Sequence, residues 1–335
     1  AFTVNPVGPG DAGSYDVVVT GTCSLSVTSS AAALTVNAPP SITIPPAGAT
    51  VCTGGSTTFS VSATGTDLTY QWRKDTVNMA GATGSSLTID PVATGDAGSY
   101  DVVVSGACSP AATSSAATLT VNLPVGITTP PAAQTVCLND PAAFSVAASG
   151  TGPLTYQWRK NGANISGATS SSYAISAVTS TSAGAYDVVV TGVCNPSGVI
   201  SDGATLTVNL PPVITTSPSS QAVCAGATVN FSVTATGAPP LTYQWRKAGV
   251  NISGATAATL TLNSVEAADG GNYDVVVSGA CSPAATSSAA ALTVNTPPNI
   301  ISQSGSQTVC QGAAVSFSVT ATGASLNYQW RKDGI

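Results

Sequence analysis

The pentapeptide Tyr-Gln-Trp-Arg-Lys occurs four times in this chain of 335 residues, at positions 70–74, 156–160, 243–247 and 328–332. Its tryptophans are the only four in the sequence and lie 86, 87 and 85 residues apart, at Trp72, Trp158, Trp245 and Trp330. A period of this length predicts repeated units of domain size. All eight Lys and Arg residues fall in these pentapeptides, so one segment per repeat supplies both a large apolar side chain and the positive charge.

The period divides the chain into three complete units and two partial ones. We expect complete domains at 38–122, 123–209 and 210–295, the C-terminal part of a domain at 1–37, and the N-terminal part of one at 296–335. The joins are short and contain proline, as in Asn-Ala-Pro-Pro at 37–40. Such a join favours an extended, stiff connection and cannot continue a helix.

The composition is that of folded domains with few charges. Charged residues make up 7% of the chain, against about 25% in ordinary globular proteins. With 43% hydrophobic residues, many at alternating positions, each repeat can bury a core, which argues against disorder. No apolar run approaches the roughly 20 residues of a membrane span. Solubility must come from hydroxyl groups and a net charge of −6, which indicates an extracellular or cell-surface protein.

Short alternating segments predict the fold class. Apolar and polar side chains alternate at 57–63 and again at 69–73, as in half-buried strands. Further strands of the same repeat are expected at 87–89, 100–104 and 119–121. Strands this short, separated by Gly, Pro, Asn and Ser, predict an all-β sandwich of about seven strands per repeat.

One motif adds a family resemblance to this pattern. The Asp-Ala-Gly-x-Tyr motif that ends at Tyr100 follows the strand of Trp72, and the two together resemble an immunoglobulin-like domain, here the tandem repeats of bacterial secreted and cell-surface proteins. The resemblance implies that the motif's tyrosine bonds back to its turn and that the tryptophan packs between two sheets. These core roles would fall on Tyr15, Tyr100, Tyr186, Tyr273 and the four tryptophans. By the same resemblance, 1–37 would hold the last three strands of a domain (E to G) and 296–335 the first three (A to C).

The sequence also departs from that family. Vertebrate-type domains carry a cysteine two residues after the corner tyrosine and another on the second strand, whereas Val102 and Val61 stand at these places here. The core is therefore expected to hold by packing alone. Ser182 replaces the corner aspartate in the second complete repeat, so we expect that corner to be less rigid.

The cysteines lie outside the usual positions. Each repeat has one in the turn before its second strand and one after its sixth. The first group is Cys52, Cys137, Cys224 and Cys310, and the second is Cys23, Cys108, Cys194 and Cys281. Eight cysteines in an extracellular chain indicate disulfides.

The resemblance limits which cysteines can pair. In an immunoglobulin-like sandwich Cys52 and Cys108 would lie roughly 30 Å apart, whereas bridged Cα atoms lie within about 7 Å. The first group lies at the end where a domain's chain leaves, and the second where the chain enters. We therefore expect bonds between successive domains, from Cys52 to Cys194 and from Cys137 to Cys281. The alternative is free or nonspecifically paired thiols.

Several chemistries lack the residues they need. Without histidine there is no base for a hydrolytic triad, and neither Cys-x-x-Cys nor Asp-x-Asp supports a metal site. Fourteen acidic residues exceed the eight basic ones, which argues against nucleic acid. We therefore expect no catalytic activity, no cofactor, no metal, no nucleic-acid partner and no membrane span in this segment.

The Arg-Lys pairs have two interpretations. Repeated once per domain, they could bind an acidic cell-surface polysaccharide or a neighbouring chain. Alternatively, each arginine pairs with an aspartate across the outer face of its own sheet, as Arg73 with Asp101. Arg159 with Asp187 and Arg246 with Asp274 would be the equivalent pairs. We favour the second interpretation.

Three functions remain open. The chain could be a segment of an extracellular structural filament, the stalk or ligand-binding region of a bacterial adhesin, or the accessory repeats of a larger secreted enzyme. The loops are the same Ser, Ala and Gly in every repeat, and no aromatic cluster forms a carbohydrate platform. Near-identical repeats favour the filament, because a binding repeat would diverge in its loops.

The partial units suggest a partner. Neither could fold alone, since each leaves an open edge and half a core. We expect residues 297–335 of one copy to complete a sandwich with residues 1–37 of the next, either between subunits or along a longer continuous chain. A head-to-tail filament follows. In that register Cys224 would bond Cys23 of the next copy, and Cys310 would bond its Cys108.

Overall fold

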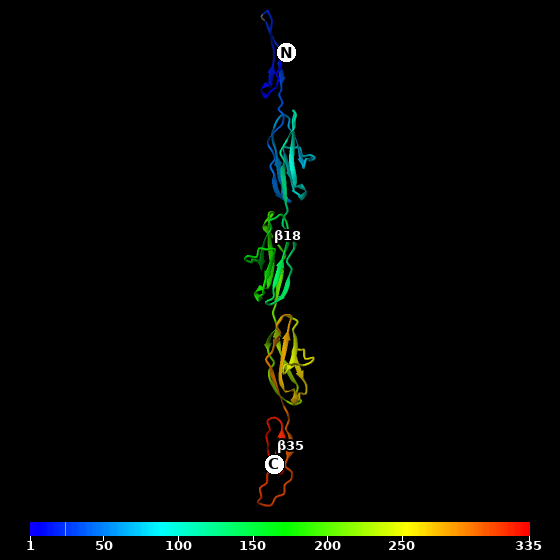
Figure 1. The fold of residues 1–335 in the computed structure, drawn as a ribbon, viewed down its shortest axis with the longest axis vertical. Coiled ribbons are helices and arrows are strands. Elements are labelled where there is room, and N and C mark those ends of the chain that lie inside the picture. The colour runs from blue at the N-terminus through cyan, green and yellow to red at the C-terminus, as the bar shows by residue number, and fades with distance from the viewer. Residues whose placement is uncertain (24) are drawn as a thin grey trace.

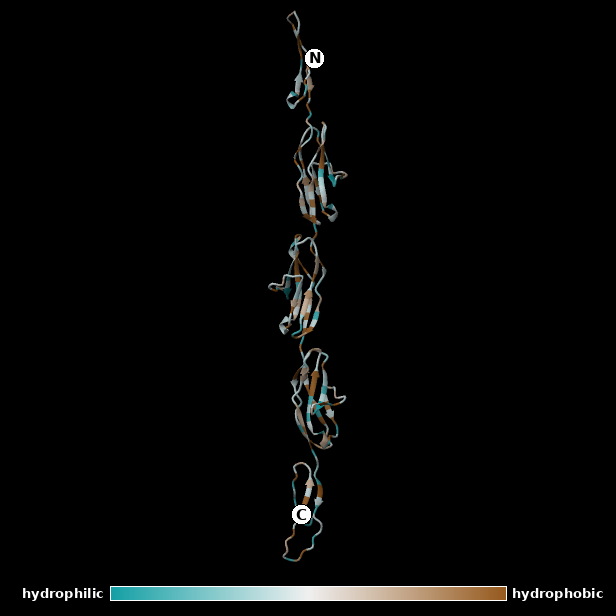
Figure 2. Ribbon diagram, in the orientation of Figure 1, coloured by the Kyte–Doolittle hydropathy of each residue, from teal (hydrophilic) through white to brown (hydrophobic). Residues whose placement is uncertain are grey.

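The computed structural model describes residues 1–23 and 25–335 as a row of β-domains in one line (Figure 1). The two chain ends lie at opposite ends of this row. The prediction of an all-β fold of tandem immunoglobulin-like sandwiches is confirmed. Apolar and polar segments alternate along the strands of each domain (Figure 2).

The first complete domain sets the pattern for the others. One sheet has the strand order β10-β9-β12-β14-β6, with β13 added to β12, and the pairs β11-β7 and β5-β8 lie on the other side of the core. Its strands are β5 (Ser41–Ile44), β6 (Ala49–Cys52), β7 (Thr57–Ser60), β8 (Ser62–Thr64), β9 (Thr69–Lys74), β10 (Val77–Asn78), β11 (Ser86–Ile89), β12 (Gly98–Ser105), β13 (Ala112–Thr113) and β14 (Ala117–Asn122).

The second and third complete domains repeat this topology. The second contains β15 (Gly126–Thr129), β16 (Gln134–Cys137), β17 (Ala142–Ser145), β18 (Ala147–Ser149), β19 (Thr155–Lys160), β20 (Ala163–Asn164), β21 (Ser172–Ile175), β22 (Gly184–Gly192), β23 (Asn195–Ile200) and β24 (Ala204–Asn209). The third contains β25 (Val213–Thr216), β26 (Gln221–Cys224), β27 (Val229–Ser232), β28 (Thr234–Thr236), β29 (Thr242–Lys247), β30 (Val250–Asn251), β31 (Thr259–Leu262), β32 (Gly271–Ser278), β33 (Ala285–Thr286) and β34 (Ala290–Asn295).

The first strand of each domain changes sheets, which the sequence analysis missed. In the first complete domain β5 pairs antiparallel with β8, whereas β6 pairs parallel with β14 in the opposite sheet. Pro45 and Pro46 lie between the two strands, and proline cannot donate to a ladder. Cys52, which we expected in a turn, therefore closes the strand β6.

Each core is centred on its tryptophan. Trp72 is fully buried, and its indole Nε1 donates to the carbonyl oxygen of Gly84 over 2.9 Å. Phe59 stacks on Tyr100 with ring centroids 5.0 Å apart. On β12 the buried side chains alternate as Tyr100, Val102 and Val104, as a half-buried strand requires. Val102 thus fills by packing the place that a disulfide cysteine holds in vertebrate-type domains.

The two end segments hold fewer strands. Residues 1–37 contain the pairs β1-β4 and β2-β3, and residues 296–335 contain the pair β35-β36. These strands are β1 (Gly13–Tyr15), β2 (Val18–Thr20), β3 (Ser26–Thr28), β4 (Ala32–Leu34), β35 (Asn299–Gln303) and β36 (Val319–Thr322). Short 3-10 turns precede the corner tyrosines at η1 (Pro9–Asp11), η2 (Thr94–Asp96), η3 (Ser180–Ser182) and η4 (Ala267–Asp269).

Candidate functional site: the junctions between domains

Two chain segments leave each complete domain side by side. Cys52 closes β6 and Asn122 closes the neighbouring parallel strand β14, and the two residues are partners in the register. The amide of Thr53 donates to the carbonyl oxygen of Asn122 over 2.9 Å. Because parallel strands end at the same edge, the cysteine and the linker point together toward the next domain.

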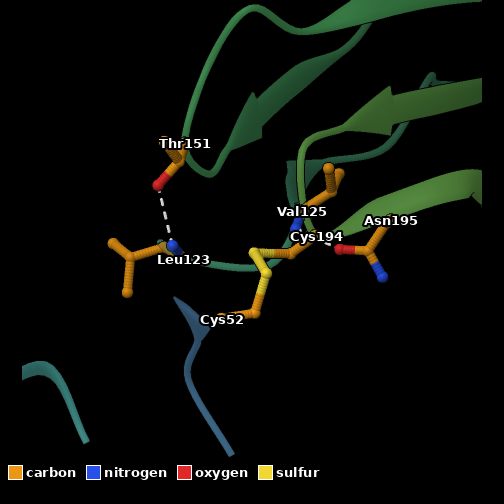
Figure 3. The surroundings of a disulfide bond; sticks show 6 residues. All are labelled: Cys52, Leu123, Val125, Thr151, Cys194 and Asn195. Carbon is orange, nitrogen blue, oxygen red and sulfur yellow. Dashed lines mark hydrogen bonds between the residues drawn. A yellow bond between two sulfur atoms is a disulfide. The ribbon is translucent and has the colours of Figure 1, made fainter. Parts of the chain in front are cut away.

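The next domain holds the linker by its backbone (Figure 3). The amide of Leu123 donates to Oγ1 of Thr151 over 2.7 Å, and the amide of Thr151 donates back to the carbonyl oxygen of Leu123 over 3.0 Å. The amide of Val125 donates to Oδ1 of Asn195 over 2.7 Å. These bonds satisfy linker groups that would otherwise be unpaired and fix the entry of the chain.

Disulfides join the successive domains. Cys52 is bonded to Cys194, with 5.8 Å between their Cα atoms and 142 residues between them in sequence. Cys137 is bonded to Cys281, with 5.6 Å between Cα atoms and a separation of 144 residues. These are the two pairs that we expected within one chain. The cysteines without a partner among the described residues are Cys23, Cys108, Cys224 and Cys310.

A glycine lets the receiving loop come close to the linker. Gly192 lies two residues before Cys194, and a Cβ built on it would lie 2.8 Å from Cγ2 of Val125. Real Cβ atoms essentially never come this close to another heavy atom. Any side chain at this position would therefore force Val125 or the loop that carries Cys194 to move.

The backbone contact recurs at every junction, but its side-chain partner varies. The amides of Thr66, Thr151, Ala238 and Ala324 each donate to a linker carbonyl oxygen. Thr66 and Thr151 also accept a linker amide through their hydroxyl groups, which alanine cannot do. These residues and Asn195 were not predicted from the sequence. The strand that carries Cys52 could have been, because the proline pair Pro45-Pro46 marks the point where the first strand changes sheets.

The arginines of the pentapeptides pair within their own domains. Nε and Nη2 of Arg73 lie 2.7 Å from the two carboxylate oxygens of Asp101, and the strand register places these residues opposite each other. The same bidentate pairs join Arg159 to Asp187 and Arg246 to Asp274. The hydrogen bond to the carboxylate raises the pKa of each arginine. The predicted pairing across the sheet face is confirmed.

The adjacent lysines also have intramolecular partners. Nζ of Lys74, Lys160 and Lys247 donates to the carbonyl oxygens of Gly95, Thr181 and Ala268, respectively. In the complete domains the positive charges therefore bind groups of the same sandwich. The three arginines are thus paired with carboxylates, whereas the lysines bind neutral carbonyl oxygens and keep their charge.

The corner tyrosines close the turn before each sixth strand. Their hydroxyl groups donate to the carbonyl oxygen four residues upstream over 2.7 to 2.8 Å, in the pairs Tyr15 to Asp11, Tyr100 to Asp96, Tyr186 to Ser182 and Tyr273 to Asp269. Burial, first of all, raises the pKa of the tyrosine in each complete domain, and the charge of the corner aspartate adds to this for Tyr100 and Tyr273.

Ser182 keeps the turn closed without a charge. Its Oγ accepts from the amide of Thr179 over 3.0 Å, where Oδ2 of Asp96 accepts from the amide of Ala93 over 2.7 Å. A hydrogen bond to a charged acceptor is stronger than one to a neutral acceptor. The expectation of a less rigid corner stays a prediction.

Two of the expected core residues are not buried in the chain. The core around Trp330 was expected only together with residues 1–37 of a next copy or of a longer chain, so its burial there stays a prediction. Within residues 296–335 Trp330 is 58% exposed, whereas Trp72 is fully buried. The reason is that the strands that cover Trp72 in a complete domain, such as β11 and β12, have no counterpart in this segment. Tyr15 is only partly buried and contacts Phe2, with 5.9 Å between ring centroids.

Comparisons with known proteins agree with this fold. Residues 39–105 and 211–278 match the family model described as immunoglobulin domain. The chain is similar to human hemicentin-1, with 27% identity over 324 residues, and to Roundabout homolog 1 of Rattus norvegicus, with 29% identity over 229 residues. These alignments cover 90% and 61% of this chain but only 6% and 14% of the two relatives.

A solved structure shows the same fold. The fragment I67–I69 of the titin I-band superposes with a TM-score of 0.58 at 20% identity and covers 77% of this chain and 99% of the fragment. Both sequence relatives are animal proteins, so they do not support the bacterial part of the resemblance. No helix in the described part of the chain is both long enough and apolar enough to cross a membrane.

Proposed function

We propose that the chain is a segment of an extracellular structural filament or surface fibre, built from immunoglobulin-like domains that are linked by disulfides between neighbours. The observation that carries this proposal is the pair of bonds from Cys52 to Cys194 and from Cys137 to Cys281. A bond between domains adds nothing to the core of either one, but it fixes their relative position. Disulfides persist in oxidising surroundings, which supports an extracellular location.

Each junction with an inter-domain disulfide, called a staple below, combines three constraints. A linker with proline at Pro124 or at Pro211-Pro212 restricts the backbone, hydrogen bonds to the next domain hold its backbone groups, and a disulfide adds a second covalent connection. Two covalent connections at one pole oppose both bending and twisting. This supports a role in setting length and direction.

The end segments support a head-to-tail partner. Phe317 and Trp330 are 55% and 58% exposed, although their counterparts Phe59 and Trp72 are buried. Phe2 is 80% exposed and precedes the corner strand that carries Tyr15. Residues 296–335 thus offer the first half of a core and residues 1–37 the second half. The partner is residues 1–37 of a second copy, or an equivalent segment along a longer chain.

The remaining cysteines fit this register. Cys224 and Cys310 lie at the end where the chain leaves their domains, and Cys23 and Cys108 lie in the loops that would receive them. We propose bonds from Cys224 to Cys23 and from Cys310 to Cys108 of the next copy. Such bonds would continue the same pattern of staples through the filament.

The other functions have less support. The arginines of the complete domains are paired with carboxylates, which argues against a polysaccharide site built on them. A stalk that carries a binding or catalytic domain elsewhere would use the same stiffness, so the filament differs from it in self-association. We also propose that this segment is neither an enzyme nor a metal protein.

Electron microscopy of the purified chain under oxidising conditions tests the filament. We expect beaded filaments that lengthen with protein concentration, and peptides that link Cys224 to Cys23 between copies. A matched control is the Cys224→Ser variant, which should associate through the apolar halves but lack that link. Compact monomers at all concentrations, with Trp330 still accessible to quenchers, would contradict the proposal.

A further inference from the structure

Two short covalent routes cross the middle domain, from the end where the chain enters it to the end where the chain leaves it. The first enters at Leu123, follows β15 and β16 to Cys137, and leaves through the disulfide to Cys281. The second enters through the disulfide from Cys52 to Cys194, follows β23 and β24 to Asn209, and leaves through the linker at Leu210. Each route has about 15 residues, which fully stretched span about 50 Å.

Both routes are already extended in the folded domain. They consist mainly of strands, and a strand rises 3.2 to 3.4 Å per residue, against at most about 3.6 Å in a stretched chain. Residues 138–193, which include the core strands β17 to β22 and Trp158, lie outside both routes. Unfolding this part of the domain therefore exposes chain that tension cannot pull out.

We infer that the two inter-domain disulfides make the row of domains a tether of nearly fixed length, which keeps its length when a domain unfolds. This inference rests on the bonds within one chain and not on the head-to-tail assembly. Its role is to limit strain. A load that opens one sandwich is then carried by the two strand segments at its edges, and the domain refolds without having been drawn out.

The outer complete domains have one short route each. In the first, residues 38–52 lead through β5 and β6 to the disulfide with Cys194. In the third, the disulfide from Cys137 leads to residues 281–295, which contain β33 and β34. Across each disulfide, the load passes from the first strands of one domain to the last strands of the next.

The alternative behaviour is that of unlinked repeats. A repeat of about 87 residues without a staple stretches to about 300 Å, so its unfolding lengthens the chain by about 250 Å. With the staples closed and the other two complete domains folded, the unfolding of one complete domain should lengthen the chain by less than about 20 Å. The expected difference is more than tenfold.

Force spectroscopy on the full chain, held at its two ends, tests this inference. In reducing buffer we expect three unfolding steps of about 250 Å each. In the oxidised chain we expect no step of that size from a single domain. When all three complete domains have unfolded, the shortest covalent route between residues 38 and 295 runs through 38–52, backward from 194 to 137, and through 281–295, about 88 residues in place of about 258. The last domain to unfold should therefore lengthen the chain by about 150 Å, still less than a step without staples.

Single substitutions separate the two staples. Cys52→Ser removes the only short route of the first complete domain, but the middle domain keeps its route through Cys137. Exactly one long step should therefore return. Cys281→Ser should likewise return only the step of the third domain. The middle domain should regain its long step only when both substitutions are combined.

Cys108→Ser serves as the matched control, because Cys108 has no partner within the described chain, and it should leave the steps short. Three long steps from the oxidised chain, with thiol titration showing both staples closed, would overturn the inference. A native chain in which titration finds Cys52 and Cys137 as free thiols would overturn it as well.

Discussion

The same five residues have different structures in two parts of this molecule. At 70–74 they form most of the strand β9, with Trp72 fully buried between the sheets. At 328–332, where residues 326–331 form no strand, Trp330 is 58% exposed. The pentapeptide therefore does not determine a strand by itself. The neighbouring strand β12, which pairs with β9 over six residues, provides the hydrogen bonds and the cover.

This difference shows that the first part of the repeat does not form its core sheet without the strands of the second part. Strand propensity depends on packing against neighbours on both faces, and at 296–335 only the pair β35-β36 forms. Residues 296–335 have the same core residues as the first part of a complete domain, but these are exposed because the strands that would cover them are absent. Each of the following substitutions compares a complete domain with an end segment.

The largest effect is expected for the tryptophans. Trp72→Ala should lower the free energy of unfolding of its domain by about 3–5 kcal/mol, because a fully buried indole leaves a cavity. Trp330→Ala should change the stability of the monomeric chain by less than about 0.5 kcal/mol. Hydrogen exchange of the amides in β7 and β12, compared with those of the third domain, measures the first effect separately for each domain.

The tryptophan comparison can also fail in an informative way. If Trp330→Ala destabilised a dilute monomer as much as Trp72→Ala, Trp330 would be buried in solution and the open end segment would be wrong. A loss that appears only at concentrations where copies associate would support the head-to-tail partner instead.

Smaller effects are expected at the tyrosine corner. Tyr100→Phe removes the hydrogen bond to the carbonyl oxygen of Asp96 and should lower the free energy of unfolding by about 1 kcal/mol. Tyr15→Phe removes an equivalent bond in a partly exposed setting and should have less effect. Equal losses in both variants, measured by hydrogen exchange in β12 and β1, would contradict the role of burial.

The corner tyrosines also predict a loss of stability in alkali. Burial raises the pKa of Tyr100 above its ordinary value of 10.0, so the folded state keeps its proton when the unfolded state has lost it. The stabilisation is complete below about pH 10 and decreases as the pH rises from there through the folded pKa. Urea unfolding of the first complete domain should therefore shift to lower midpoints as the pH rises above about 10. The Tyr100→Phe variant should show a smaller shift, and an unchanged shift would exclude Tyr100 as its source.

The ion pairs should contribute least. Arg73 and Asp101 are partly exposed, and such a pair stabilises by about 0–1 kcal/mol. Arg73→Gln should lower the thermal stability of its domain slightly, and the difference should shrink in high salt. Arg331, which forms no ion pair among the described residues, is the matched position, and Arg331→Gln should have no effect. A salt-independent loss at Arg73 would indicate a packing role for its stem instead.

Much of the fold could be predicted from the sequence, because its signals repeat. Four copies of one pentapeptide gave the period, and the Asp-Ala-Gly-x-Tyr motif indicated the sandwich. The opposition of Arg73 and Asp101 followed from the strand order. The cysteine pairs came from the poles of the sandwich, because only neighbouring domains bring Cys52 near Cys194.

What could not be predicted depends on contacts between distant residues. The sheet switch between β5 and β6 requires knowing that β14 is free to pair on its outer side. The hydrogen bond from the amide of Leu123 to Thr151 joins residues 28 positions apart, which no local pattern encodes. Trp330 shows the opposite case. Its pentapeptide is complete, but Trp330 is exposed because the strands that would cover it are absent from residues 296–335.

The central claim is that covalent bonds join successive domains, and mass spectrometry of the non-reduced protein tests it most directly. Free thiols are first blocked in the native protein, which is then digested with trypsin and fragmented so that each bonded cysteine is located. The account predicts that the peptide with Cys52 is linked to the one with Cys194, and the peptide with Cys137 to the one with Cys281. A bond from Cys52 to Cys108 within one domain, or blocked thiols at all four positions, would contradict it.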